Sequence, residues 1–275
     1  MSYINDQLNH TLKNFEIKLG EDHYSGKVRE NYYLDDKIVM VTTDRVSAFD
    51  HILGTIPFKG EVLTQIAKFW FEKTKDIAPN HYLKDPDPQV LLTLKANPLP
   101  VEIIIRGYIT GSLWRDYTSG INNQYGFKIP DNMVKDQKFE EPIITPTTKA
   151  EYGEHDQPIS KEEIVSGLVD RNIYEKAEQY AMELYLEGQQ WANKRGLILV
   201  DTKYEFGMVG DELYVIDEIH TPDSSRYWIL DKYEERFELS KNQLMLDKEN
   251  IRQWLIEKGF SGEGTPPKLS DNIRI

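Results

Sequence analysis

Cysteine is absent from all 275 residues of this sequence. The absence excludes disulfide bonds, thiolate metal sites and a cysteine nucleophile, and it agrees with a reducing cytoplasm. No stretch approaches the roughly 20 consecutive apolar residues of a membrane span, and the first ten residues lack the basic-then-apolar pattern of a signal peptide. We therefore expect a cytoplasmic protein that has no membrane partner.

Positive charge is also scarce, because 33 Lys and Arg residues stand against 46 Asp and Glu residues, giving a formal net charge of −13. Such a field repels phosphate backbones, so we expect no nucleic-acid partner. Small anions would need local clusters of Arg, Lys and backbone N–H groups. The chain is long enough for one large α+β domain or for two lobes.

Hydrophobic periodicity predicts the first elements. Residues 26–34 and 37–43 are expected to form two strands, residues 60–77 a helix, and residues 101–106 a central strand. The Pro-rich stretch 79–100 is expected to be a loop.

In the second half of the chain, Ser160 and Glu163 have the spacing of a capping box, which predicts a helix start. The apolar stripe along 173–192 predicts a longer helix packed in the core. Residues 197–206 and 213–219 are expected to form a hairpin, and residues 250–258 a last helix that ends at Gly259.

Lys27 and Arg29 follow Gly26, a pattern that suggests phosphate binding. It is not a Walker A loop, because five residues rather than four separate Gly20 from Gly26, and Val28 stands where a Ser or Thr should bind magnesium. Two cations on one face of a strand could still lay a nucleotide's phosphates along a β lobe. The alternative is an exposed basic strand.

Residues 44–50 combine two carboxylates, a guanidinium and a hydroxyl where a strand passes into a loop, and loops commonly display binding groups. The alternative is a turn held by an Asp–Arg ion pair. Lys59 and Gly60, just before the next helix, offer another anion contact beside unpaired N–H groups.

A further oxyanion site is predicted where the central strand ends, at residues 106–112. Gly107 and Gly111 let backbone approach a ligand closely, and Arg106 can bind a phosphate or carboxylate with two N–H groups. Glu102, an ionisable residue in an apolar run, should have a cation or a hydrogen-bonding partner.

Two polar loops allow more than one interpretation. Residues 145–149 and 153–156 suit either a nucleotide-proximal lysine with a metal-binding aspartate or an ordinary polar surface. In residues 217–226, Ser224, Ser225 and Arg226 could cradle a phosphate monoester. His220 in the same loop could be a general base, although a lone loop histidine is more often structural.

The hairpin carries the strongest local signal. Asp201, Lys203 and Glu205 alternate along one strand and so share a face, and we expect Asp217 on the same face, opposite Asp201 or Lys203. Three clustered carboxylates repel one another, and a divalent cation would offset this repulsion. Oxygen ligands favour Mg²⁺ over zinc. The alternative is a solvated face neutralised by Lys203.

Taken in order, these blocks resemble the SAICAR synthetase (phosphoribosylaminoimidazole-succinocarboxamide synthase) family. The match covers residues 26–27, 44–50, 106–112, 145–156, 201–207 and 217–226. Six ordered blocks over about two hundred residues are far more specific than any one of them. The blocks at 44–50 and 146–149 resemble the longer variety of the family.

The resemblance implies an α+β fold with a small antiparallel β lobe and a larger α+β lobe, and ATP in the cleft between them. We place the nucleotide-binding lobe at residues 1–98 and the lobe with substrate and metal sites at 99–275. The implied reaction is a two-step ligation in de novo purine biosynthesis. ATP phosphorylates the carboxylate of carboxyaminoimidazole ribotide (CAIR), and the amine of L-aspartate then displaces phosphate to give the succinocarboxamide (SAICAR).

The resemblance also implies residue roles. Those expected at ATP are Lys27, Val28, Arg29, Glu102, Lys149, Glu205 and Asp217. Those expected to bind substrate are Asp44, Arg45, Ser47, Asp50, Arg106, Ser112, Ser224, Ser225 and Arg226. Asp201 and Lys203 are the expected catalytic groups, and Glu205, Asp217 and Asp156 the expected Mg²⁺ ligands.

Two other classes of function stay open from the sequence. One is a different ATP-using enzyme, either another carboxylate-amine ligase or a small-molecule kinase. The other is a non-catalytic nucleotide-binding module. The sequence does not fix the oligomeric state.

Overall fold

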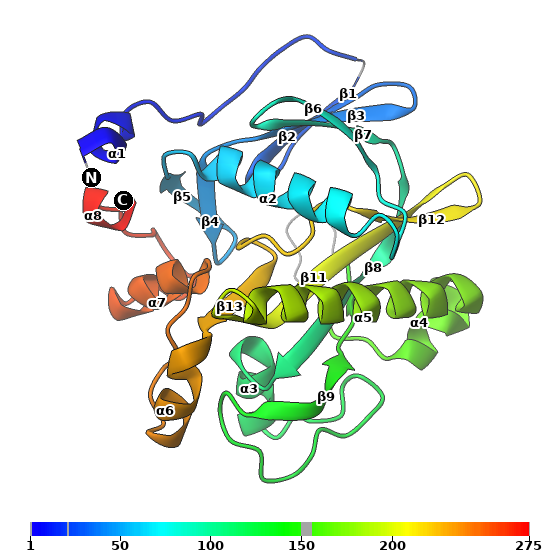
Figure 1. The fold of residues 1–275 in the computed structure, drawn as a ribbon, viewed down its shortest axis with the longest axis vertical. Coiled ribbons are helices and arrows are strands. Elements are labelled where there is room, and N and C mark those ends of the chain that lie inside the picture. The colour runs from blue at the N-terminus through cyan, green and yellow to red at the C-terminus, as the bar shows by residue number, and fades with distance from the viewer. Residues whose placement is uncertain (1, 21, 150–155, 275) are drawn as a thin grey trace. The chain divides into compact units, whose positions relative to one another are not determined.

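The computed structural model describes residues 2–20, 22–149 and 156–274 (Figure 1). The chain divides into two compact units. Unit 1 comprises Met1–Lys73, His81–Lys95 and Lys248–Ile275, and unit 2 comprises Thr74–Asn80 and Ala96–Asp247. Among the described residues, no helix is both long and apolar enough to cross a membrane.

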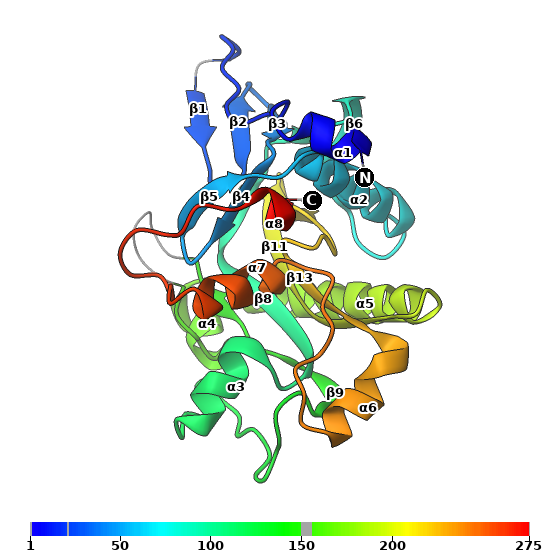
Figure 2. The same cartoon turned by 90° about the vertical axis from the view of Figure 1, so that its left-hand side faces the viewer.

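Unit 1 is built on an antiparallel sheet of five strands in the order β1-β2-β3-β7-β6. Strands β1 to β3 lie side by side in Figure 2. The strands are β1 (Asp22–Ser25), β2 (Arg29–Tyr33), β3 (Lys37–Thr42), β6 (Tyr82–Asp87) and β7 (Val90–Leu94). A separate pair consists of β4 (Arg45–Ala48) and β5 (His51–Thr55), and the helices are α1 (Ser2–Gln7), α2 (Lys59–Lys73), α7 (Glu249–Glu257) and α8 (Asp271–Arg274).

Helix α2 confirms the expected helical stripe. Leu63, Ala67, Trp70 and Phe71 are buried at the spacing of one helix face. The helix ends at Lys73, four residues before the predicted end at 77.

The Pro-rich stretch is not the expected loop. It contains β6 and β7, which pair as a hairpin. Pro86 is tolerated because β6 is the edge strand, where a missing N–H breaks no ladder on its open side. Pro88 lies in the turn.

The division of the chain differs from the predicted boundary at residue 98 in three places. Thr74–Asn80 groups with unit 2, Lys248–Ile275 groups with unit 1, and residues 96–98 group with unit 2. The second difference has a packing reason, because Leu255 and Phe260, from α7 and just beyond it, are buried against Ala48 of β4.

Unit 2 is built on a mixed arrangement of helices around an antiparallel sheet whose two long strands are β8 (Asn97–Tyr108) and β11 (Leu197–Val209). The neighbours of β8 are β9 (Lys138–Ile144) and β10 (Thr147–Thr148), and those of β11 are β12 (Glu212–Ile216) and β13 (Ser225–Ile229). The helices are α3 (Gly111–Thr118), α4 (Lys161–Gly167), α5 (Arg171–Asn193) and α6 (Tyr233–Glu238), with a 3₁₀ turn at Leu230–Lys232.

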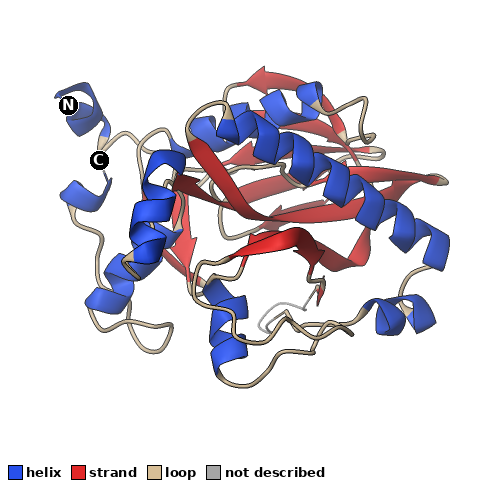
Figure 3. Ribbon diagram, turned by 60° about the horizontal axis from the view of Figure 1, so that its bottom comes forward, coloured by secondary structure: helices blue, strands red, loops and turns tan. Residues whose placement is uncertain are grey.

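Helix α5 lies along the sheet of unit 2 (Figure 3). Its buried face confirms that the predicted apolar stripe is core packing. Ser160 forms the expected capping box with Glu163 at the start of α4, and Asp170 caps α5 through the N–H groups of Asn172 and Ile173. The predicted α+β class, with an antiparallel β-rich part and a larger α+β part, is thereby confirmed.

Candidate functional site

Ionisable side chains run along one face of the two long strands of unit 2. In the register between β8 and β11, Arg106 pairs with Asp201, Ile104 with Lys203, and Glu102 with Glu205. Paired residues share a face, and so do residues two apart on one strand. The predicted common face of Asp201, Lys203 and Glu205 therefore extends onto β8, and successive pairs are about 7 Å apart along the strand.

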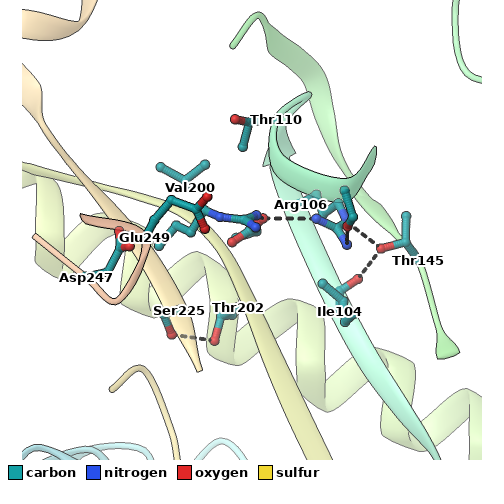
Figure 4. A network of polar contacts seen from close by, with 12 residues as sticks. Ile104, Arg106, Thr110, Thr145, Val200, Thr202, Ser225, Asp247 and Glu249 are labelled. Atoms are coloured by element: carbon teal, nitrogen blue, oxygen red, sulfur yellow. Dashed lines mark hydrogen bonds and ion pairs between the residues drawn. The ribbon is translucent and has the colours of Figure 1, made fainter. Parts of the chain in front are cut away.

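At one end of this face, buried Arg106 and half-buried Arg226 share one carboxylate. Arg106 Nη1 lies 3.1 Å from Asp201 Oδ2, and Arg226 Nη1 also donates to Asp201 Oδ2. Arg106 Nε donates to Thr145 Oγ1 at 2.9 Å, and Nη2 makes a long contact of 3.5 Å with Ser112 Oγ. Figure 4 shows Arg106 directed toward Thr145. We call this group the arginine pair.

Gly111 makes room for the arginine pair. Its φ of +59° is in the left-handed region, and an added Cβ would meet Arg226 Nη2 at 2.3 Å and Cζ at 2.5 Å. The guanidinium of Arg226 thus lies against the backbone at the start of α3, where the sequence predicted the close approach of a ligand.

Ser225 does not join the predicted phosphate cradle. Its hydroxyl is 2.8 Å from that of Thr202 (Figure 4), and both side chains are buried on the opposite face of the sheet from Arg226. The reason is strand alternation, because neighbours on β13 point to opposite faces. Ser224 lies before β13, and its hydroxyl is 3.4 Å from the carbonyl oxygen of Thr221.

At the other end of the face, two lysines lie among carboxylates, and we call this group the lysine cluster. Lys203 Nζ donates to Glu102 Oε1 at 2.7 Å and to Glu205 Oε1 at 2.6 Å. Lys149 Nζ donates to Glu205 Oε2. Glu102 therefore has the cationic partner that its burial requires, as predicted.

Burial and charge perturb the pKa values of the lysine cluster. Burial raises the pKa of Glu102 to about 7, although Lys203 opposes this shift. Burial acts in the same direction on Glu205, but Lys203 and Lys149 outweigh it and hold the pKa of Glu205 below its usual value. Burial would lower the pKa of Lys203, and the charges of Glu205, Glu102 and Asp217 raise it well above normal instead. Such opposed shifts are typical of functional sites.

Asp217 reaches the lysine cluster by a route that differs from the predicted one. Val209 pairs with Glu212 and Glu205 with Ile216, so the turn is Gly210 and Asp211 and no ladder pair places Asp217 opposite Asp201 or Lys203. Strand β12 ends at Ile216, and Asp217 has a φ of +67°. Its charge nevertheless raises the pKa of both Lys203 and Lys149.

The predicted magnesium ligands do not form a preformed metal-binding site among the described residues. In the ranges 2–20, 22–149 and 156–274, no three or more metal-ligating side chains group so as to hold an ion. Asp156 is close enough that its charge helps to raise the pKa of Glu102, while residues 153–155 of the predicted loop lie outside the described residues. Glu205 and Asp217 suit the usual mode of Mg²⁺, which takes one or two carboxylates plus substrate phosphates.

His220 is a structural residue rather than a base. Its ring is buried against Gly188 of α5, where an added Cβ would meet Cε1 at 2.4 Å, and Nε2 is hydrogen-bonded to the Tyr204 hydroxyl. Burial lowers the pKa of His220 to about 3.

In unit 1, the glycine-and-cation motif forms a turn. Lys27 and Val28 precede β2, which begins at Arg29, so Lys27 and Arg29 do not both lie on the strand as predicted. Lys27 Nζ forms an ion pair with Asp50, and the carbonyl oxygen of Val28 accepts from the backbone and hydroxyl of Thr43.

Arg45 and Asp44 do not have the geometry of the predicted substrate contacts. Arg45 is 3% exposed, and its N–H groups donate to Glu30 and to four backbone carbonyls, of Lys13, Gly26, Lys27 and Arg29. A guanidinium has five N–H groups, so these partners use its whole capacity. Asp44 accepts from the backbone N–H groups of Leu12 and Gly60, the latter in the first turn of α2. Ser47 is buried in β4.

Asp136 was not predicted. The Thr110 hydroxyl donates to Asp136 Oδ1 at 2.7 Å, and the Tyr233 hydroxyl donates to its backbone carbonyl. Burial raises the pKa of Asp136, while the nearby charge of Arg226 is among those that lower it. The sequence around Asp136 contains no motif or periodicity that would have predicted its location beside Thr110 and Arg226.

The chain is similar to one family of proteins over nearly its whole length. The family model described as SAICAR synthetase matches residues 22–268. A Bacteroides thetaiotaomicron phosphoribosylaminoimidazole-succinocarboxamide synthase is 52% identical over 256 residues, which are 92% of this chain and 82% of that protein. Among solved structures, the Saccharomyces cerevisiae SAICAR synthase complexed with SAICAR has a TM-score of 0.82 and 31% identity, covering 96% of this chain and 93% of its own. A type-2 SAICAR synthetase in complex with ADP has the same fold, with a TM-score of 0.66 and 23% identity over 90% of this chain and 100% of its own.

Proposed function

The chain belongs to the SAICAR synthetase family, and we propose that the arginine pair and the lysine cluster divide its reaction between them. The reaction is the ATP-dependent condensation of CAIR with L-aspartate in purine biosynthesis, which yields SAICAR, ADP and phosphate. The observation that carries the proposal is the face shared by β8 and β11, where an anion site and a phosphoryl-handling site are two residues apart along one strand.

The arginine pair binds the ribotide. Two guanidinium groups with a single shared carboxylate keep an excess of positive charge in a largely buried place, which suits a phosphate or carboxylate. Ser112 and the backbone beside Gly111 lie within reach of the same ligand. Arg226 is assigned to the phosphate of the ribotide.

The lysine cluster handles the transferred phosphoryl group. One carboxylate oxygen of CAIR attacks the γ-phosphorus of ATP, the bond from that phosphorus to the bridging oxygen breaks, and ADP leaves. Lys203 and Lys149 neutralise charge on the phosphoryl oxygens, because their raised pKa values keep them protonated. The amine of aspartate then attacks the acyl carbon, loses a proton, and inorganic phosphate departs.

Glu205 and Asp217 would hold Mg²⁺ together with phosphate oxygens of ATP, and Asp156 is a further ligand candidate. When bound, the ion supplies positive charge that offsets the polyphosphate. The turn before β2 is assigned to the ATP phosphates, through Lys27, Val28 and Arg29. Asp50, which forms an ion pair with Lys27, keeps the assignment to substrate that the family resemblance implies. The position of ATP between the two lobes stays a prediction.

The test is aspartate-dependent ADP release by the purified protein with Mg-ATP and CAIR, with the product identified by mass. Asp217→Asn should abolish product, because it removes a carboxylate beside both lysines. Asp211→Asn is the matched control, since Asp211 lies in the exposed turn of the same hairpin. ATP hydrolysis without the succinocarboxamide would favour a kinase, and nucleotide binding without turnover would favour a non-catalytic module.

A further inference from the structure

Strand β11 is irregular beside the arginine pair. Leu199 pairs with Tyr227 of β13 and Asp201 with Arg226, so two steps on β11 match one step on β13 and Val200 is the extra residue. Such bulges bend a strand and re-aim its side chains, often next to functional sites. Here the bulge places Asp201 directly beside Arg226.

One side chain from α5 holds this bulge. The hydroxyl of Tyr185 lies 2.9 Å from the carbonyl oxygen of Leu199 and 3.2 Å from that of Val200, and the residue is fully buried. Consecutive carbonyls of a regular strand point to opposite neighbours, so their convergence on one hydroxyl is specific to the bulged backbone. Without this donor, buried carbonyls would lose a hydrogen-bond partner.

Gly107 of β8 leaves room for the Tyr185 hydroxyl beside the strand backbone. An added Cβ would lie 2.3 Å from the Tyr185 hydroxyl oxygen but 3.4 Å from Cζ, so the obstacle is the hydroxyl rather than the ring. Gly107 directly follows Arg106. Tyr185 therefore contacts the backbone next to both the arginine and the carboxylate that define the anion site.

We propose that Tyr185 is a positioning residue for the ribotide, and that it acts by fixing the β11 bulge which brings Asp201 between Arg106 and Arg226. The proposal rests on the proposed role of the arginine pair in ribotide binding. It involves no contact between Tyr185 and the substrate. Burial and the charge of Asp201 both raise the pKa of Tyr185, so the hydroxyl remains a donor at any pH of assay.

The first variant is Tyr185→Phe, which removes the hydroxyl and keeps the ring. We expect the KM for CAIR to rise roughly 5- to 150-fold, the range that corresponds to leaving a buried carbonyl unsatisfied, while the KM for ATP changes less than about twofold. The matched control is Tyr174→Phe. Tyr174 is a buried tyrosine of the same helix whose hydroxyl lies near Glu178 of α5 rather than against β11.

A second pair of variants tests the geometry through Gly107. Gly107→Ala alone should raise the KM for CAIR at least as much as Tyr185→Phe, because the new methyl group displaces the hydroxyl. In the Tyr185→Phe background the same change should add less than about twofold, since the contacts that remain, 3.4 Å with Cζ and 3.5 Å with Gln189 Nε2, are ordinary van der Waals distances. Such non-additivity is the signature of two residues acting through one contact.

Hydrogen exchange of the β11 backbone separates this proposal from the proposed function. Tyr185→Phe should speed exchange by at least about tenfold at residues 199–203, and Tyr174→Phe should not. If the wild type makes no succinocarboxamide, the proposed function fails, while exchange still decides whether Tyr185 holds the bulge. An active Tyr185→Phe enzyme with unchanged KM for CAIR, unchanged exchange or additive behaviour with Gly107→Ala would overturn the positioning role.

Discussion

Replacing Asp201 with asparagine should expose how much of unit 2 depends on the arginine pair. Both guanidinium groups donate to the same Asp201 oxygen, so their charges lie within roughly 6 Å of each other. At an effective dielectric constant near 20, their repulsion is about 3 kcal/mol, and the Asp201 charge offsets it in the wild type. The asparagine side chain would keep an oxygen acceptor but remove that charge.

We therefore expect Asp201→Asn to lower the free energy of unfolding by about 3 kcal/mol, the lower end of the range for removing one partner of a buried ion pair. For a chain of this size the melting temperature should fall by roughly 6 to 12 °C. The catalytic efficiency with CAIR should fall at least about 100-fold, because the two arginines lose their common alignment.

The assay is thermal and urea unfolding of wild type, Asp201→Asn and Asp211→Asn, each with and without about 50 mM inorganic phosphate as the probe. Phosphate should recover more of the melting temperature in Asp201→Asn than it adds to the wild type, since an anion replaces the lost charge. A fall of less than about 2 °C, or equal stabilisation of both proteins by phosphate, would refute the shared-carboxylate reasoning.

Glu102, Gly111 and Arg45 each give one further prediction. Because the folded state raises the pKa of Glu102 to about 7, it binds a proton more tightly than the unfolded chain, so this residue's contribution to stability falls as pH rises from about 4.5 to 7. Glu102→Gln should remove that slope in urea unfolding at several pH values, whereas Glu212→Gln should keep it, because Glu212 is the exposed first residue of β12. Gly111→Ala should raise the KM for CAIR roughly tenfold or more through its clash with the neighbouring guanidinium, whereas Gly120→Ala, which also has positive φ but open space, should leave it unchanged in steady-state assays. Arg45→Lys should destabilise the protein by about 2 to 4 kcal/mol in urea unfolding. It should also raise the KM for ATP and leave the KM for CAIR unchanged. A raised KM for CAIR with an unchanged KM for ATP would instead assign Arg45 to substrate binding.

Alternation of charge along 201–205 was sufficient to predict that these residues share one face, because the period of a strand is two whatever its partners are. The capping box and the long apolar stripe of α5 were also readable, since both depend on neighbours within a few turns. Each of these signals depends only on residues within a single helix or strand.

Long-range pairing decided the features that were predicted incorrectly or not at all. Arg45 lies in a segment with the composition of a ligand-binding loop, but it donates to backbone carbonyls of its own chain. These carbonyls are 16 to 32 residues away in sequence, and no local pattern indicates them. Asp217 reaches the lysine cluster through a positive φ rather than through the ladder. The hairpin β6–β7 could not be predicted from the sequence, because Pro86 is compatible with a strand only at the edge position that β6 takes in the sheet.

The two ends of the face shared by β8 and β11 differ in charge, and this difference predicts where a metal is needed. The arginine pair sets two cations against one carboxylate, whereas the lysine cluster sets two cations against Glu102, Glu205 and Asp217. An anion can therefore enter the first without help, but a polyphosphate entering the second needs added positive charge. We expect EDTA to weaken ATP binding at least about 10-fold in calorimetric titration and to leave CAIR binding within about twofold. Equal dependence of both ligands on Mg²⁺ would mean that the metal organises the whole face and that the arginine pair is not an independent anion site.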